Sequence, residues 1–289
     1  MASIPGSHYD IFAPKQTVNF GVTTDPNNVP APVAGAFNLE VVTNGTGTGS
    51  FTTAPGYQGL AVLSADGHTL TLLHGNYGAV HNPGGGDRIL FGDGSVSVMG
   101  AAGDTLMGGT GLNQFLDAHL GNQSVLGGSG GSETIWGGPG DTIQGGSGGN
   151  ETIAGVSGET IIGGAANTFF DATSGNESIV AGSGNSTIWG GAHDTIQGAS
   201  GSGSALIGFA GGNEILWDNG VTTTGHDSVS TFSQAGGDRV SLNSATDTIA
   251  NVLGTATSSG GNTTVTLNDG STITFIGISS VNSGLFTTH

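Results

Sequence analysis

Residues 127–162 read GGSGGSETIWGGPGDTIQGGSGGNETIAGVSGETII, and this stretch decides the fold. It divides into four steps of ten, eight, ten and eight residues, and every step ends in an acidic residue, a threonine, an isoleucine and one further residue. The last four residues of each step are typical of a short strand, in which side chains alternate between the two faces. The glycines before them are typical of a turn. One ten-residue step and one eight-residue step therefore make one coil, which contains two strands and two turns.

The isoleucine position recurs far beyond this stretch, with a mean spacing of nine residues. A helix is excluded, because glycine pairs in nearly every step would cost about 1 kcal/mol per glycine. The repeat predicts an all-β fold, a parallel β-roll or β-solenoid whose strands stack roughly 4.8 Å apart. The predicted inward ladder is Ile89, Val98, Leu106, Phe115, Val125, Ile135, Ile143, Ile153, Ile161, Phe169, Ile179, Ile188, Ile196, Leu206 and Ile215.

The repeat divides the chain into three regions. Residues 1–85 are expected to form an extended arm, running to about Pro32, followed by a short β-rich region with alternating apolar residues. Residues 86–217 form the glycine-rich β-solenoid. Residues 218–289 form a C-terminal cap, in which two alternating strands around an Asn-Asp-Gly turn predict a hairpin that closes the solenoid.

The composition excludes several classes of partner. The 289 residues include 3 Lys and Arg against 21 Asp and Glu, which gives a formal net charge of −18. We therefore expect no binding to nucleic acid or to anionic membrane surfaces. No apolar stretch is long enough to insert into a bilayer. The chain has no cysteine, so it can form neither a disulfide nor a thiolate metal site.

Residues 108–116, GGTGLNQFL, resemble the nonapeptide G-G-x-G-x-D-x-U-x of the repeats-in-toxin (RTX) calcium-binding proteins, with Asn113 in place of the aspartate. Residues 225–242, which include GHDSVSTF and GGDRVSL, resemble the block that follows such repeats. The end of the chain resembles the family's capping hairpin and uncleaved type I secretion signal. The resemblance implies a calcium-binding β-roll that is secreted from a Gram-negative bacterium to its surface or surroundings, and the absence of an N-terminal signal peptide agrees with it. Removal of residues from about 225 onward is expected to keep the chain inside the cell.

Acidic residues precede the inward ladder at regular intervals. Asp141, Glu159, Glu177 and Asp194 follow one another at intervals of one coil, the last interval being one residue shorter, so they should stack one coil apart. Two carboxylates at about 4.8 Å repel by roughly 1 kcal/mol in water and about 3.5 kcal/mol at an effective dielectric of 20. Ca²⁺, which prefers oxygen ligands, would remove that cost. The alternative is that these side chains point into solvent. The candidate metal ligands are Asp104, Asp141, Glu159, Glu177, Asp194, Glu133, Glu151 and Asp227.

Large apolar residues follow the ladder on alternate steps. The row contains Leu116, Trp136, Ala154, Phe170, Trp189 and Ile207. An exposed apolar strip of this extent marks a protein contact, and we predict an assembly interface at Trp136, Phe170 and Trp189. The alternative is that the N-terminal region folds over the strip.

These observations favour a secreted structural protein over an enzyme. We expect a homo-oligomer or homopolymer that builds an extracellular filament, matrix or surface layer, with calcium in the turns and a cell-surface polysaccharide as a further partner. The alternative is a secreted polysaccharide-acting enzyme, or a carbohydrate-binding or adhesin module, on the same scaffold. With three cations in the chain, little is left to neutralise an acidic sugar, and no metalloprotease motif is present.

Overall fold

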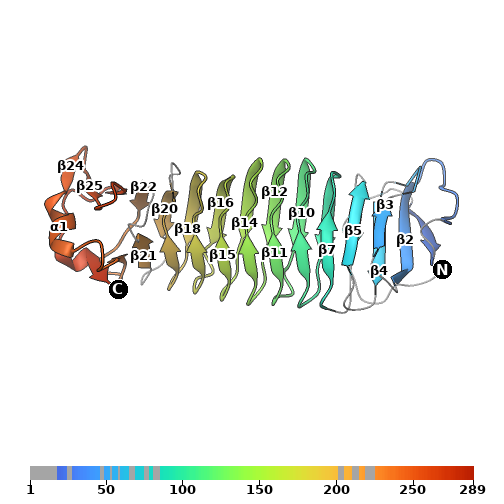
Figure 1. Cartoon of the computed structure of the whole chain (residues 1–289), viewed down its shortest axis with the longest axis horizontal. Coiled ribbons are helices and arrows are strands. Elements are labelled where there is room, and N and C mark those ends of the chain that lie inside the picture. The colour runs from blue at the N-terminus through green and yellow to red at the C-terminus, as the bar shows by residue number, and fades with distance from the viewer. Residues whose placement is uncertain are drawn as a thin grey trace.

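The computed structural model is an elongated parallel β-solenoid in which successive coils stack along one axis (Figure 1). The structure describes residues 18–24, 28–45, 49–52, 54–57, 59–64, 69–74, 78–80, 85–200, 205–209, 215–218 and 225–289. The fold is nearly all-β, with coils of about 18 residues. The fold class predicted from the repeat is confirmed.

Two long sheets form the two faces of the rod, and successive strands of the repeat alternate between them. The twelve-stranded sheet contains β3 (Gly49–Thr52), β5 (Thr69–His74), β7 (Arg88–Phe91), β9 (Thr105–Met107), β11 (Ser124–Leu126), β13 (Thr142–Gln144), β15 (Thr160–Ile162), β17 (Ser178–Val180), β19 (Thr195–Gln197), β21 (Ile215–Asp218), β23 (Arg239–Leu242) and β27 (Phe286–Thr288). The eleven-stranded sheet contains β8 (Val96–Met99), β10 (Asn113–Asp117), β12 (Ser132–Trp136), β14 (Asn150–Ala154), β16 (Asn167–Ala172), β18 (Ser186–Gly190), β20 (Ala205–Phe209), β22 (His226–Ser230), β24 (Thr257–Ser259), β25 (Asn262–Thr266) and β26 (Thr272–Phe275).

The solenoid continues on the N-terminal side of residue 86. A four-stranded parallel sheet contains β1 (Val18–Thr23), β2 (Phe37–Gly45), β4 (Gly59–Ser64) and β6 (Gly78–Val80). Strands β3 and β5 belong to the same sheet as β7, so the rise in glycine near residue 85 is not accompanied by a break in that sheet. The expected β-rich region is present. The expected arm is wrong for Val18–Thr23, which pairs with β2 of its own chain, and residues 1–17 lie outside the described residues.

A column of stacked apolar side chains fills the interior. Ile143 pairs with Ile161 and Ile161 with Ile179 in one sheet, and Ile135 pairs with Ile153 in the other. All of these side chains are buried. Side chains stacked at strand spacing fill the interior at the close packing typical of protein cores.

The predicted ladder is off by one residue in three strands, and the register of a fourth strand differs from it as well. The inward residues of β10, β16 and β20 are Leu116, Phe170 and Ile207, whereas Phe115, Phe169 and Leu206 lie on the outer face. In β21, Leu216 and not Ile215 is in register with Ile196. Each of these strands has two adjacent apolar residues, so alternation alone leaves the register undecided.

The C-terminal segment caps one end of the rod, as the sequence predicts. Strands β25 and β26 form an antiparallel hairpin, and β26 pairs in parallel with β22. The helix α1 (Ile249–Gly254) buries Val252 against the core, and Thr248 caps its N-terminus by accepting from the Asn251 N–H. The short 3-10 helix η1 (Ser283–Leu285) precedes the last strand. This end of the molecule therefore carries its own cover (Figure 1).

Candidate functional site

The most unusual feature of the interior is a row of buried acidic side chains along one edge of the rod. Each acid comes directly before a strand of the twelve-stranded sheet and directly after a residue with a positive φ angle, such as Gly140 (80°) or Gly158 (91°). The left-handed turn residue directs the following side chain into the coil. The strand registers confirm that Asp141, Glu159, Glu177 and Asp194 occupy equivalent positions in successive coils. Their alternative placement in solvent is wrong, because all four are buried.

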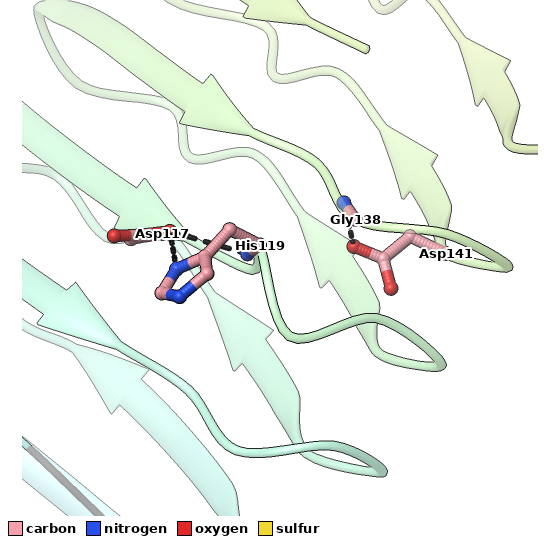
Figure 2. A network of polar contacts seen from close by, with 4 residues as sticks. All are labelled: Asp117, His119, Gly138 and Asp141. Atoms are coloured by element: carbon pink, nitrogen blue, oxygen red, sulfur yellow. Dashed lines mark hydrogen bonds and ion pairs between the residues drawn. The ribbon is translucent and has the colours of Figure 1, made fainter. Parts of the chain in front are cut away.

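The aspartates of this row bind backbone N–H groups of the turns. Asp141 accepts from the N–H of Gly138 and of Gln123, each at 2.7 Å, and the Gly138 contact is drawn in Figure 2. Asp104 and Asp194 accept two N–H groups in the same way. In each case one N–H belongs to the aspartate's own turn and the other to the preceding coil. These carboxylates therefore fasten neighbouring turns together.

A second row lines the opposite edge, before the inward residues of the eleven-stranded sheet. Glu133 accepts from the Gly128 N–H, and Glu151 accepts from the Gly146 N–H and from the Thr168 hydroxyl. Gln114 occupies the same position one coil earlier and accepts from the Gly109 N–H. Asp227 accepts the N–H groups of Ala199 and Ala205. In the nonapeptide, the side chain that binds the turn is therefore the buried Gln114, whereas Asn113 is exposed.

Two glutamates are less well satisfied. The Oε2 of Glu159 accepts from the Val156 N–H, but its Oε1 has no hydrogen-bond partner, and neither oxygen of Glu177 has one. The nearby Gly175 N–H donates to the Ala172 carbonyl at 3.2 Å, and it also partly offsets the rise in the pKa of Glu177. Glu133 also has one unpartnered oxygen. A buried carboxylate without full hydrogen bonding is costly in its charged form.

Glycines make room for these two carboxylates. A Cβ added at Gly137 would collide with the Glu159 carboxylate. A Cβ added at Gly155 would lie 2.5 Å from the Oε1 of Glu177 and 2.7 Å from the Oε2 of Glu159. Gly155 therefore lies between two carboxylates of successive coils.

Burial raises the pKa values of the whole set. Desolvation, together with the charges of neighbouring carboxylates, raises the pKa of Glu159 and of Glu177 to about 8 each. Desolvation also raises the pKa of Glu133 to about 7 and that of Asp141 and Asp227 to about 6 each. Desolvation is also the main cause of the raised pKa values of Asp104, Glu151 and Asp194. Of these carboxylates, Glu133, Glu159 and Glu177 have pKa values at or above neutral pH.

The fit of these residues to a calcium ion differs along the rows. Both oxygens of Asp104, Asp141 and Asp194 already accept N–H groups, which orient toward anions and not cations. Glu159 and Glu177 fit better, because they are adjacent, buried and have free oxygens. Within the part of the chain that the structure describes, no cluster of three or more His, Asp or Glu side chains is arranged to hold a metal ion.

The predicted aromatic strip is only partly exposed. Trp136 and Trp189 are 51% and 54% exposed on the outer face of the eleven-stranded sheet. Phe170 is fully buried and cannot form part of an interface, and the same holds for Leu116 and Ile207. Their burial follows from the one-residue shift in register, since adjacent residues of a strand face opposite sides. The described N-terminal strands β1 to β6 stack as coils of the solenoid and do not fold over the two exposed tryptophans. Residues 1–17 lie outside the described residues.

Sequence reasoning missed the partners of the two tryptophans. Phe115 packs edge-to-face against Trp136, with ring centroids 4.9 Å apart, and Phe169 packs in the same way against Trp189. The predicted ladder places both phenylalanines in the interior instead. The sequence does contain a signal for the pairing, because the two phenylalanines and the two tryptophans are separated by the same length of chain to within one residue.

The fold and the buried acids define this chain as a parallel β-solenoid whose turns are held by side-chain carboxylates. No protein-family model matches the chain, and no curated protein sequence matches it significantly. Of the described helices, none has the length and apolar character needed to cross a bilayer.

Proposed function

We propose that this chain is a secreted structural protein that self-associates outside a Gram-negative cell through its N-terminal end. The proposal rests on a difference between the two ends of the rod, since among the described residues only the C-terminal end is seen to carry a cap. Helix α1 and the β25–β26 hairpin cover the C-terminal end. At the other end, β1 is the outermost strand of the four-stranded sheet. Solenoid ends with free strand edges need a cap or a partner.

The side chains of β1 support an association at this edge. Phe20 and Val22 are 51% and 46% exposed, and Val33 nearby is exposed as well. Exposed apolar residues on an edge strand favour pairing with another strand. Two copies related by a two-fold axis would pair their β1 edges antiparallel and bury both patches. One covered end stops growth after this step, so end-to-end pairing yields a dimeric rod and not an unlimited filament.

The proposal includes one calcium-binding site inside the solenoid. The ion would be held by Glu159 and Glu177, whose free buried oxygens supply hard ligands and whose negative charges it would compensate. Its role is structural, because the pair lies inside the coil, where a substrate has no access. Secretion is supported by the resemblance of the C-terminal segment to type I secretion regions and by the absence of cysteine.

Light scattering of the full chain after size-exclusion chromatography tests the self-association. The parent should elute with the mass of a dimer, and a variant with Phe20→Lys and Val22→Lys should elute as a monomer, because charges on an edge strand prevent pairing. A matched control replaces two exposed leucines elsewhere, Leu112→Lys and Leu120→Lys, and should remain dimeric. If the parent chain and the β1 variant both have the mass of a monomer, the proposal of self-association fails.

A further inference from the structure

The outer face of the eleven-stranded sheet carries the same group of side chains twice. The Trp136 cluster consists of Phe115, Asp117, His119 and Trp136. The Trp189 cluster consists of Phe169, Asp171, Thr173 and Trp189. In each cluster the aspartate and the tryptophan are in register on neighbouring strands, so both side chains leave the same face.

The repetition is a property of the surface and not of the core. Residues 113–124, NQFLDAHLGNQS, and residues 167–178, NTFFDATSGNES, are related across three coils. The coil of β14 between them has Thr152 and Ala154 at the outward positions that the aromatic residues occupy elsewhere. The core isoleucine is present in this coil too. The aromatic pair is therefore spaced by three coils, while the core repeats in every coil.

Each tryptophan is exposed yet held in place. The edge-to-face phenylalanine supports one side of the indole, at interplanar angles of 87° and 85° in the two clusters. In each cluster the aspartate that is in register with the tryptophan fixes a polar group two residues further along its own chain segment. Asp117 Oδ1 lies 2.7 Å from the His119 Nδ1, as Figure 2 shows, and Asp171 Oδ1 accepts from the Thr173 hydroxyl at 2.8 Å. Both clusters thus combine a rigid apolar plate with an oriented hydrogen-bonding group, which lowers the entropy cost of binding.

We propose that this face binds a neutral, linear polysaccharide that runs along the rod axis, with Trp136 and Trp189 as its two stacking platforms. A pyranose ring has an apolar C–H face and a rim of hydroxyl groups. The C–H face stacks on an indole, whose amphipathic ring suits partly wet contacts. The hydroxyl rim meets the polar groups anchored by Asp117 and Asp171. This binding goes beyond the self-association proposed above and does not depend on it.

The negative charge of the chain favours a neutral polysaccharide over an anionic polysaccharide or a second copy of the chain as the ligand of this face. The chain carries a net charge of −18, and both clusters contain an aspartate. Lys15, Arg88 and Arg239 all lie outside residues 96–209, the segment that contains the two clusters. An anionic polysaccharide would be repelled. A second copy of the chain would place aspartate against aspartate on a face that contains no lysine or arginine to compensate.

The spacing makes a further demand on the ligand. Three strand spacings place the two clusters about 14 Å apart along the rod. A chain of sugars long enough to reach both tryptophans gains from effective concentration, and a shorter one does not. Affinity should therefore rise steeply with chain length at the span of the two clusters and then level off.

Isothermal titration calorimetry with the full chain tests the proposal on defined probes. These are hydroxyethyl cellulose and dextran as neutral polymers, alginate as an anionic polymer, and cello-oligosaccharides of increasing length. At least one neutral polymer should bind and alginate should not. Trp136→Ala and Trp189→Ala should each weaken binding about tenfold or more, as expected for the loss of a central aromatic contact. The double variant should abolish it.

Ile162→Ala, an exposed apolar residue on the opposite face, serves as the matched control and should bind as the parent does. Absence of binding to both neutral polymers overturns the proposal, as does equal binding of alginate. The light-scattering mass of each tryptophan variant is measured in parallel. If the tryptophan variants lose self-association while their glycan binding is unchanged, the face is a protein contact and the polysaccharide proposal fails. If only the β1 variant loses the dimer, the polysaccharide proposal is unaffected.

Discussion

At the scale of single residues, the pair Glu159 and Glu177 has fewer hydrogen bonds than the aspartates of the same row. Asp141 and Asp194 each accept two backbone N–H groups, which offset part of the cost of burial. The glutamate pair has less compensation, because three of its four oxygens have no hydrogen-bond donor. The pair must be neutral or accompanied by a cation.

Without added divalent cations, stability should fall as the pH rises. The two glutamates have a folded-state pKa of about 8 against 4.5 in the unfolded chain. Between these values the folded state binds more protons than the unfolded state, so the free energy of unfolding decreases with pH. Each pKa unit is worth about 1.4 kcal/mol, and a loss on the order of a few kcal/mol is expected between about pH 5 and pH 9. Denaturant titrations in the presence of chelator measure it.

Glu159→Gln combined with Glu177→Gln keeps the shape of the side chains and removes their ionisation. This variant should lose most of the pH dependence. Asp93→Asn, which changes an exposed acid, serves as the control and should behave like the parent. A double glutamine variant with the full pH dependence of the parent would show that other groups cause it.

At the scale of the strand, the turn decides which face is inward. A polar side chain that binds the turn lies two residues before every inward apolar residue of the eleven-stranded sheet from β10 to β18. Gln114 and Leu116 show the relation in β10, and Thr168 and Phe170 show it in β16. Gln114 accepts a turn N–H, and Thr168 donates its hydroxyl to the Ala166 carbonyl of its turn and to the Glu151 carboxylate. Because these contacts anchor the first residue of each pair on the inner side, the second is directed into the core as well.

This relation gives a direct comparison within one strand. Leu116→Ala removes a fully buried side chain and should lower the free energy of unfolding by about 2–5 kcal/mol. Phe115→Ala removes a larger side chain from the outer face and should cost about 1 kcal/mol or less. Chemical denaturation of both variants measures the difference. The reverse order would mean that the register of β10 is the one in which Phe115 faces inward.

At the scale of the whole molecule, each coil contacts mainly its neighbours, so stability accumulates along the rod. The C-terminal end is covered by α1 and its hairpin, and among the residues that the structure describes β1 is the outermost strand at the N-terminal end and carries exposed apolar side chains. Poorly compensated charges in one coil therefore lower the stability of the neighbouring coils as well. A ligand that compensates these charges should stabilise the whole solenoid.

Calcium should raise the melting temperature at neutral pH. A ligand that binds only the folded state stabilises it by about 2.7 kcal/mol at 100 times its dissociation constant. Differential scanning fluorimetry with Ca²⁺ and with excess chelator measures the shift. The variant with Glu159→Gln and Glu177→Gln should show no shift, whereas Asp93→Asn should respond as the parent does. A parent that melts at one temperature under both conditions would contradict the calcium proposal.

The sequence by itself determined the architecture. Alternating steps of eight and ten residues with glycine turns leave no alternative to a coil of two strands and two turns, because the strand period and the turn residues agree at every step. The stacking of Asp141, Glu159, Glu177 and Asp194 followed from the same spacing. The C-terminal hairpin followed from alternation and its turn.

Only the tertiary structure decided the facing of individual side chains. Adjacent apolar residues such as Phe169 and Phe170 satisfy a period of two in either register, and the choice depends on anchoring by neighbouring turns. The same holds for the acids, since a carboxylate before a strand is equally suited to solvent or to capping backbone N–H groups. Its place is set by the left-handed turn residue before it and by the groups of the preceding coil. Such contacts join residues that lie a full coil apart in the chain, and a local sequence pattern does not contain them.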